Sequence, residues 1–217
     1  GPSSTIMGAM LEHRNQERRG LFLVVDGVDG CGKTTQAGRL AERLGVEPEL
    51  HLREPGSTAL GEALRALLLD RRYQIEPAVE TLMFAAARRQ MLDELVEPAL
   101  AAGKTVVCER FHPSTFAYQA VAGSLAPEAV MGLLQDWAGA PQPDMILLLD
   151  MDVDEAAKRR GAATDRIEAK GLDFQRRVAE GYRAYAELDP RAILIDGNQT
   201  PDVVHAAILQ EVQRVRS

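Results

Sequence analysis

The sequence predicts a doubly wound α/β fold, in which helices cover both faces of a parallel sheet. Short apolar runs rich in β-branched residues alternate with longer segments that have helical periodicity. The runs are continuous rather than alternating, which is typical of parallel strands that are buried on both faces. With 217 residues, the chain is long enough for one domain with a full hydrophobic core.

Five strands are expected, over residues 21–26, 49–53, 105–109, 145–150 and 192–196. The expected helices are 33–44, 58–70, 77–102, 127–138, 153–160, 168–187 and 201–215. Pro77 suits the first turn of the third helix, whereas Pro98 is expected to kink or shorten it. Residues 158–171 are charged and contain two glycines, so we expect a short lid there.

Composition and chain ends exclude several classes of protein. The first ten residues, GPSSTIMGAM, resemble a protease-processing scar, so the domain is expected over 11–217, and residues 11–20 fit neither a signal nor a transit peptide. No apolar run is long enough to span a membrane. The net charge of −7 argues against binding a nucleic acid polymer or an anionic membrane. Cys31 and Cys108 are too few for a disulfide framework or a zinc site, which favours the reducing cytoplasm.

Residues 27–34 read GVDGCGKT and match the phosphate-binding pattern G-x-x-x-x-G-K-[ST]. The glycines allow backbone N–H groups to turn toward a phosphate, and the helix that follows adds its positive end. Lys33 is expected to bridge the β- and γ-phosphates of a nucleotide, and Thr34 to hold Mg²⁺. The expected strand before this pattern and the helix after it predict a P-loop NTPase fold. The chain lacks an N-K-x-D guanine motif, and its length favours a small-molecule kinase.

Polar residues beyond the expected strands are candidates for binding a phosphoryl acceptor. Arg53 follows the second strand and can pair with a phosphate, although taken alone a surface turn is the simpler interpretation. Phe84 and Arg88 lie four residues apart on one helical face, where a ring and a guanidinium can contact a planar base. In isolation, this pair fits a core phenylalanine and a solvated arginine better.

Two further clusters carry charge that suits phosphoryl transfer. Glu109 can bind Mg²⁺ directly or through water, and Arg110 can clamp a transferring phosphoryl group. Arg159, Arg160 and Arg166 lie in the expected lid. These arginines form either an ordinary solvated face or a lid that closes over phosphates.

The motifs DGVDGCGKTTQ, REPGST, FAAARR, ERFHPSTFAYQ, DRIE and DGNQTP follow one another in the order seen in thymidylate kinases. The chain resembles that family over nearly all of residues 20–215. The resemblance implies transfer of a phosphoryl group from MgATP to dTMP, which yields dTDP for dTTP synthesis. It also implies a P-loop fold with a five-stranded parallel sheet and a short lid, and a homodimer packed through helices. The alternatives are a deoxynucleoside kinase, a kinase of another monophosphate such as dUMP, and a nucleotide-binding regulatory protein without turnover.

The resemblance also assigns acceptor contacts to individual residues. Asp29 resembles the residue that holds the 3′-hydroxyl of dTMP, and Arg53 resembles a contact to its phosphate. Phe84 resembles the ring that stacks on thymine, Arg88 the donor to thymine O4, and Thr115 the polar side chain at thymine N3.

The remaining assignments concern the sugar, the phosphates and the metal. Tyr118 resembles the ring that faces C2′ and disfavours ribose, and Arg110 resembles an arginine placed between the donor and acceptor phosphates. The implied ATP-binding residues are Gly27, Val28, Asp29, Gly30, Cys31, Gly32, Lys33, Thr34, Thr35, Arg159 and Gln199. The implied catalytic residues are Lys33, Glu109, Arg110, Arg160 and Arg166, and the implied Mg²⁺ residues are Thr34, Asp26 and Glu109.

The chain departs from the family pattern at Asp26, Glu109 and Ser57, and Gly30 indicates its subclass. Gly30 stands where one subclass has an arginine, so the chain resembles the bacterial-type subclass that carries its arginines in the lid. The family usually has a glutamate at the position of Asp26 and an aspartate at the position of Glu109, so the two residue types have changed places. We hypothesise that Asp26 and Glu109 organise Mg²⁺ together. Ser57 replaces a glycine, which implies an ordinary backbone conformation there or a slightly shifted turn.

Overall fold

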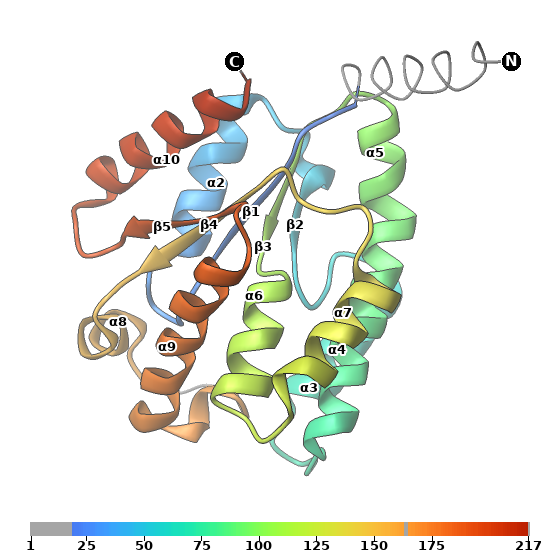
Figure 1. Ribbon diagram of the computed structural model, residues 1–217, viewed down its shortest axis with the longest axis vertical. Helices are drawn as coiled ribbons and strands as arrows, with labels where there is room; N and C mark the ends of the chain where they lie inside the picture. The colour runs from blue at the N-terminus through green and yellow to red at the C-terminus, as the bar shows by residue number, and fades with distance from the viewer. Residues whose placement is uncertain (1–18, 163–164, 217) are drawn as a thin grey trace, which may run out of the picture.

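A five-stranded parallel sheet forms the centre of the computed structural model, which describes residues 19–162 and 165–216 (Figure 1). Its order is β2-β3-β1-β4-β5. The strands are β1 (Phe22–Gly27), β2 (His51–Arg53), β3 (Val106–Glu109), β4 (Met145–Asp150) and β5 (Ala192–Asp196). The predicted fold class is therefore confirmed. Residues 1–10, expected to be a processing scar, lie outside the described residues.

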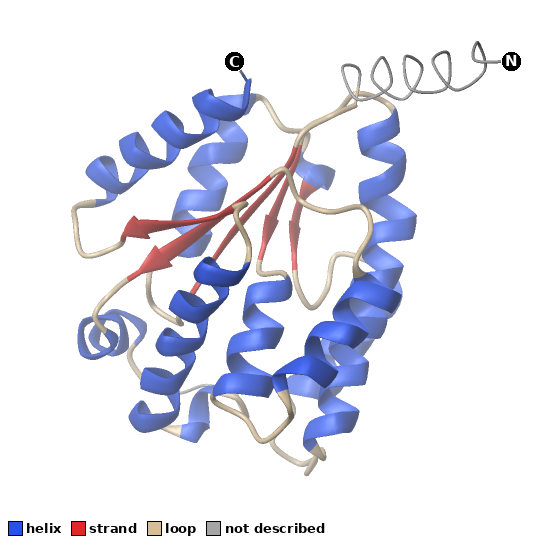
Figure 2. Ribbon diagram, viewed as in Figure 1, coloured by secondary structure: helices blue, strands red, loops and turns tan. Residues whose placement is uncertain are grey.

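Helices cover both faces of this sheet (Figure 2). They are α2 (Lys33–Leu44), α3 (Ala59–Leu69), α4 (Pro77–Met91), α5 (Glu97–Ala101), α6 (His112–Thr115), α7 (Pro127–Ala138), α8 (Val153–Arg160), α9 (Leu172–Leu188) and α10 (Pro201–Arg216). Helices α2 and α10 pack together on one face, and α6 and α9 lie on the other. Within the described residues, no helix is long and apolar enough to cross a lipid bilayer.

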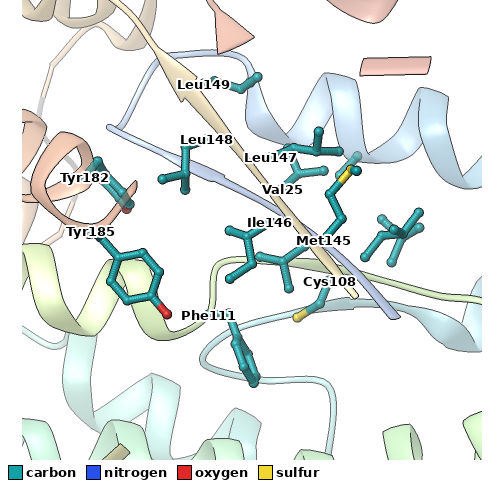
Figure 3. Close-up of a cluster of buried hydrophobic side chains, with 14 of the residues drawn as sticks. Val25, Cys108, Phe111, Met145, Ile146, Leu147, Leu148, Leu149, Tyr182 and Tyr185 are labelled. Atoms are coloured by element: carbon teal, nitrogen blue, oxygen red, sulfur yellow. The ribbon is translucent and has the colours of Figure 1, made fainter. Parts of the chain in front are cut away.

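The core lies on both sides of β1 and β4, as expected from their continuous apolar sequences. All six residues of β1 are buried, and so are the first five of β4. On the side of α6 and α9, Ile146 and Leu148 lie near Phe111, Tyr182 and Tyr185 (Figure 3). Burial of this apolar surface is the main term that stabilises the fold.

One helical segment escaped prediction because it is buried all round. Helix α6 begins two residues after β3 and continues without a break into the π-helical η3 (Phe116–Val121), and nearly every side chain in α6 and η3 is buried. Such a helix has no polar face and therefore no amphipathic period in its sequence. This segment carries Thr115 and Tyr118.

Two predicted boundaries were wrong, and one expected effect of a proline is absent. The third helix is not shortened at Pro98 but continues to Ala101, close to its predicted end, with a π-helical turn, η2 (Leu92–Val96), joining α4 to α5. In that turn the N–H of Glu97 donates to the carbonyl of Leu92, and Pro98 follows with no N–H to satisfy. The expected helix 168–187 is a 3₁₀ turn, η4 (Glu168–Lys170), followed by α9, and the start of the expected second strand is the 3₁₀ turn η1 (Pro48–Leu50).

Helix α9 approaches η3 closely at Gly181. A methyl group added there would lie 2.7 Å from Cα and 2.9 Å from Cβ of Ala117. Gly132 on α7 is the natural comparison, because an added methyl group would meet no atom within 4 Å. Glycine is thus required at position 181 on α9 and dispensable at position 132 on α7.

We expect Gly181→Ala to destabilise the protein by about 1–3 kcal/mol, because α9 must move away from the backbone of η3. The control Gly132→Ala should instead stabilise it by about 0.5–1 kcal/mol through helix propensity. Urea unfolding of both variants measures the difference. Equal effects of the two substitutions would contradict the close packing of α9 on η3.

His112 opens α6 as a neutral, buried side chain. Its Nε2 lies 2.8 Å from the carbonyl oxygen of Ala138 and therefore donates to it, and its ring stacks on Phe111 at a centroid distance of 4.2 Å. Burial, assisted by nearby Arg88, lowers the pKa of His112 to about 3. In the unfolded chain a histidine titrates near 6.5.

Because the pKa of His112 is lower in the folded state, its contribution to stability is present above pH 6.5 and falls as the pH drops toward 3. Between pH 7 and pH 5 this loss should be about 2 kcal/mol. Urea unfolding at several pH values should show this decline in the parent protein and a flatter profile in His112→Gln. Parallel profiles for the two proteins would refute the assignment.

Candidate functional site

The phosphate-binding loop lies between β1 and α2, at the carboxyl edge of the central strand. Gly27, Gly30 and Gly32 have φ angles of 146°, 90° and 90°, which side chains rarely adopt. A methyl group at Gly30 would also lie 2.0 Å from the carbonyl oxygen of Ala156 and 3.1 Å from Cβ of Arg160. The loop therefore has no room for a side chain at Gly30, because α8 packs directly against it.

Lys33 starts α2 and points back over the loop. It is buried, and its Nζ donates to the Val28 carbonyl at 3.1 Å and to Asp29 Oδ1 at 3.3 Å. Cys31 is also buried, and burial raises the pKa of its thiol, so only the backbone of this residue is suited to phosphate binding. Thr35 follows on the first turn of α2 and is exposed.

Asp29 joins the loop to the segment that follows β3. Its Oδ1 forms an ion pair with Arg110 in addition to the contact with Lys33, and its Oδ2 accepts from the hydroxyl of Tyr118 at 2.9 Å. Burial alone would raise the pKa of Asp29, but Arg110, Lys33 and Tyr118 outweigh burial and lower it. Arg110 has a φ of 67°, in the left-handed region that glycine favours. Such strain at a non-glycine residue is a mark of functional sites.

Glu109 ends β3 and lies beside the loop. Its Oε2 accepts from the hydroxyl of Thr34 at 2.8 Å, and its Oε1 lies 3.1 Å from Nε2 of His51. A carboxylate and a hydroxyl at this spacing form an oxygen pair of the kind that Mg²⁺ prefers. The structure thus brings Thr34 and Glu109 together, as the sequence suggested.

Asp26 does not join that pair. Its carboxylate is fully buried and accepts from the backbone N–H groups of Gly27, Phe111 and Ser114, and it lies 2.9 Å from the Ser114 hydroxyl and 2.8 Å from the Tyr182 hydroxyl. These groups occupy the carboxylate oxygens and leave them closed to a metal ion. These contacts do not support the hypothesis that Asp26 and Glu109 organise Mg²⁺ together; they hold the start of α6 against β1.

Two adjoining cavities open at this edge of the sheet. One has a volume of about 160 Å³, and its lining includes Phe84, Arg88, Thr115, Tyr118 and Gln119. The other has a volume of about 310 Å³, and its lining includes Lys33, Thr34, Arg53, Glu109 and Arg160. The residues that line both are Asp29, Glu54, Arg65, Arg110 and Glu168. A basic, polar cavity thus meets a partly apolar one at the Asp29–Arg110 pair.

Arg88 is the most deeply buried cation of the smaller cavity. Its Nε and Nη2 bind the carboxylate of Glu54 at 2.6–3.0 Å, and its Nη2 also donates to the Thr115 hydroxyl at 3.1 Å. Its Nη1 is buried and has no hydrogen-bond partner among the described residues. Burial raises the pKa of Glu54 and the adjacent Arg88 opposes that rise. The free N–H donor of Arg88 is available to a bound molecule.

Two site residues were missed from the sequence. Glu54 follows Arg53 directly, and its role emerges only from its contact with Arg88, which lies on another element. Arg65 lies on α3, bonds the carbonyl of Pro55 at 3.0 Å and lines both cavities. The sequence did not indicate that Arg65 lines a cavity, because an arginine inside a helical segment is ordinarily solvated.

Arg53 and Ser57 flank the turn after β2. Arg53 is exposed, lines the larger cavity and lies 3.4 Å from Glu62. Ser57 has a left-handed backbone conformation, with a φ of 68°. Its hydroxyl accepts from the Arg53 N–H at 2.8 Å and donates to the Arg53 carbonyl at 3.1 Å. The expectation of an ordinary backbone conformation at Ser57 was therefore wrong, because these bonds hold the turn in the strained form.

The three candidate lid arginines have separate environments. Arg160 ends α8 beside Gly30 and lines the larger cavity, and its buried Nε has no hydrogen-bond partner in the part of the chain that the structure describes. Arg159 lies 3.5 Å from Glu155 on the same helix. Arg166 forms an ion pair with Glu80 on α4 and does not line the larger cavity. Gln199 bonds Asp196 at 2.8 Å, in the loop before α10.

The parallel sheet, the glycine loop and the second cavity define a P-loop enzyme that acts on a nucleotide and a second small substrate. The family model for thymidylate kinase matches residues 25–208. The chain is 43% identical over 206 residues to a thymidylate kinase of Gluconobacter oxydans, with 89% of this chain and 94% of the relative covered. It is 40% identical over 199 residues to one of Caldanaerobacter subterraneus, with coverages of 90% and 96%. The chain therefore belongs to the thymidylate kinase family.

Proposed function

We propose that this protein transfers the γ-phosphoryl group of ATP to the phosphate of dTMP, which produces ADP and dTDP for dTTP synthesis. The observation that carries this proposal is the meeting of the two cavities at Asp29 and Arg110. ATP phosphates would occupy the larger cavity and dTMP the smaller one. The acceptor phosphate would then lie beside Arg110, where donor and acceptor meet in line.

The smaller cavity has the chemical groups that a thymine nucleotide requires. Phe84 offers a ring for stacking, and the unpaired Nη1 of Arg88 offers a donor to the O4 carbonyl. Thr115 lies beside Arg88, where it would meet N3. Tyr118 and Asp29 are hydrogen-bonded to each other and would hold the sugar, with Asp29 at the 3′-hydroxyl. Arg53 and Arg65 would contact the acceptor phosphate together with Arg110.

Positive charge for the transition state would come from three residues. Lys33 would leave its contact with Asp29 to bind the β- and γ-phosphates, and Arg110 would lie between donor and acceptor. Arg160 is the lid arginine that fits this role, since it lies over Gly30 at the edge of the larger cavity. Arg166 serves elsewhere, because Glu80 holds it. Arg159 and Gln199 would assist ATP binding at the periphery.

Thr34 and Glu109 would hold Mg²⁺ together with the phosphates of ATP. Mg²⁺ supplies charge neutralisation and orientation of those phosphates when it is bound. Among the described residues, no cluster of three metal-ligating side chains occurs, which suits an ion that takes most of its ligands from substrate and water.

The acceptor needs no strong general base, because the phosphate of dTMP is an anion near neutral pH. A deoxynucleoside kinase would instead need a carboxylate beside a neutral hydroxyl. Glu54 is the nearest candidate after β2, but Arg88 binds both of its oxygens. This engagement favours a monophosphate over a nucleoside as the acceptor.

The chain acts as one domain over 11–217 with residues 158–171 as its lid, and it forms a homodimer in the cytoplasm. Leu60 and Leu67 on α3 and Val79 and Leu82 on α4 are exposed apolar side chains on neighbouring helices. Exposed apolar surface of this kind supports an interface formed through helices.

ADP release with MgATP should be fastest with dTMP among dTMP, dUMP, dCMP, AMP and thymidine. Thymidine should react at least about a hundredfold more slowly, because it lacks the phosphate that Arg53, Arg65 and Arg110 would bind. The amino group of dCMP would meet the donor of Arg88, so dCMP should also be at least about a hundredfold slower. Fastest turnover on thymidine, or none on dTMP, would overturn the proposal.

The roles of the two exchanged carboxylates can be separated by metal titration. Glu109→Gln should raise the Mg²⁺ concentration for half-maximal activity by about tenfold and lower kcat. Asp26→Asn should leave the Mg²⁺ dependence unchanged and lower the free energy of unfolding by about 2–3 kcal/mol, since it disrupts bonds to Ser114 and Tyr182. Activity against Mg²⁺ and urea unfolding measure these effects. A shifted Mg²⁺ dependence in Asp26→Asn would restore Asp26 to the metal site.

A further inference from the structure

Glu80 on α4 is a buried carboxylate to which the proposed mechanism gives no part. Its side chain is only 4% exposed, yet it meets charged and polar groups from two other segments. It forms an ion pair with Arg166, and its Oε1 accepts from Nε2 of Gln119 at 2.9 Å. Nζ of Lys170 lies 3.8 Å away. Glu80 thus connects α4, η3 and the lid.

Hydrogen bonds to the backbone of α3 hold Arg166 in addition to its ion pair with Glu80. Its Nε donates to the carbonyl of Leu68 at 3.0 Å, and its backbone N–H donates to the carbonyl of Leu69 at 3.3 Å. Next to it, Oδ1 of Asp165 accepts from the N–H groups of Ile167 and Glu168, both at 2.9 Å. Residues 165–168 are therefore held against the end of α3 and the start of α4.

These lid residues form part of the acceptor site. Asp165, Ile167 and Glu168 line the smaller cavity, and Glu168 lines the larger one as well. Glu80 lines neither cavity. Any effect of Glu80 on the acceptor must therefore pass through the residues that it binds.

Gln119 is the second residue through which Glu80 can act. An ionised carboxylate only accepts hydrogen bonds, so the NH₂ group of Gln119 must face Glu80. The side-chain carbonyl of Gln119 then remains for the smaller cavity, which this residue lines. Glu80 thereby decides whether Gln119 offers the cavity an acceptor or a donor.

We propose that Glu80 is a positioning residue for the acceptor: its ion pair with Arg166 holds lid residues 165–168 as a wall of the dTMP cavity, and its bond to Gln119 fixes the orientation of that amide. The inference rests on the proposed function for the identity of the acceptor. If one partner of a largely buried ion pair is removed, the other is left uncompensated. Arg166 can escape this penalty by moving into solvent, which would carry the wall away from the cavity.

The ion pair with Arg166 and the hydrogen bond to Gln119 predict different kinetics for Glu80→Gln and Arg166→Gln. Both variants lose the ion pair, so both should raise KM for dTMP by about tenfold or more while KM for ATP changes less than about twofold. Only Glu80→Gln removes the carboxylate that orients Gln119. The preference for dTMP over dCMP should therefore fall in Glu80→Gln and persist in Arg166→Gln. Glu76→Gln, an exposed change of equal charge at the start of α4, is the control and should behave as the parent.

A double-mutant cycle tests whether the pair acts as a unit. The Glu80→Gln/Arg166→Gln double variant should have a KM for dTMP no higher than that of Glu80→Gln alone. Multiplicative effects of the two substitutions would overturn the proposal, and so would a similar loss of ATP and dTMP affinity. If Glu80→Gln fails to fold, Arg166→Gln carries the KM test, because it changes the lid partner and leaves Glu80 in the core.

Amide hydrogen exchange of the enzyme without substrates provides a readout that does not depend on turnover. Exchange of residues 165–170 should rise at least about tenfold in Glu80→Gln and Arg166→Gln, while that of α2 stays as in the parent. Unchanged exchange in 165–170 would refute the lid contact. If the parent enzyme does not phosphorylate dTMP, the proposed function fails, and this measurement still decides whether Glu80 holds the lid.

Discussion

The enclosed carboxylate of Asp26 is the interaction on which the rest of the site depends. It joins the end of the central strand to the start of α6 and, through Tyr182, to α9. Because β1 leads into the phosphate loop and α6 leads into η3, this one group links the elements that line the larger and the smaller cavity. Charge-assisted hydrogen bonds in a dry environment are among the stronger polar interactions in proteins, so the junction is rigid.

Around this junction the charged side chains share partners and do not form separate ion pairs. Lys33 and Arg110 both bind Asp29, and Tyr118 binds its other oxygen. Bound phosphates would compete for the two cations, so occupation of one cavity changes the groups presented to the other. The close packing of α8 on Gly30 explains why positive charge reaches the larger cavity from the end of that helix, at Arg160.

The sequence predicted the sheet and the local parts of the site, because these follow from patterns within a few residues. Lys33 and Thr34 belong to one motif, and Phe84 and Arg88 share one helical face. The relation between Asp26 and Glu109 could not be judged from the sequence, because it depends on the strand register. Val25, not Asp26, is the register partner of Glu109, so the side chains of Asp26 and Glu109 point to opposite faces of the sheet. The ion-pair partners of Arg166 and Glu54 were not predicted because they lie far along the chain. Helix α6 and η3 were missed because burial on every side removes the amphipathic pattern.

The burial of η3 has a consequence for redesign of the enzyme. Tyr118 and Gln119 line the smaller cavity, but their backbone is enclosed by α9 and by the core. A substitution that alters sugar or base preference there must also fit the packing around Ala117 and Gly181, where an added methyl group already clashes. Phe84 and Arg65, which are only partly buried, offer more freedom. Engineering of altered nucleotide preference should therefore begin on α3 and α4, where a new side chain does not disturb the packing of the core.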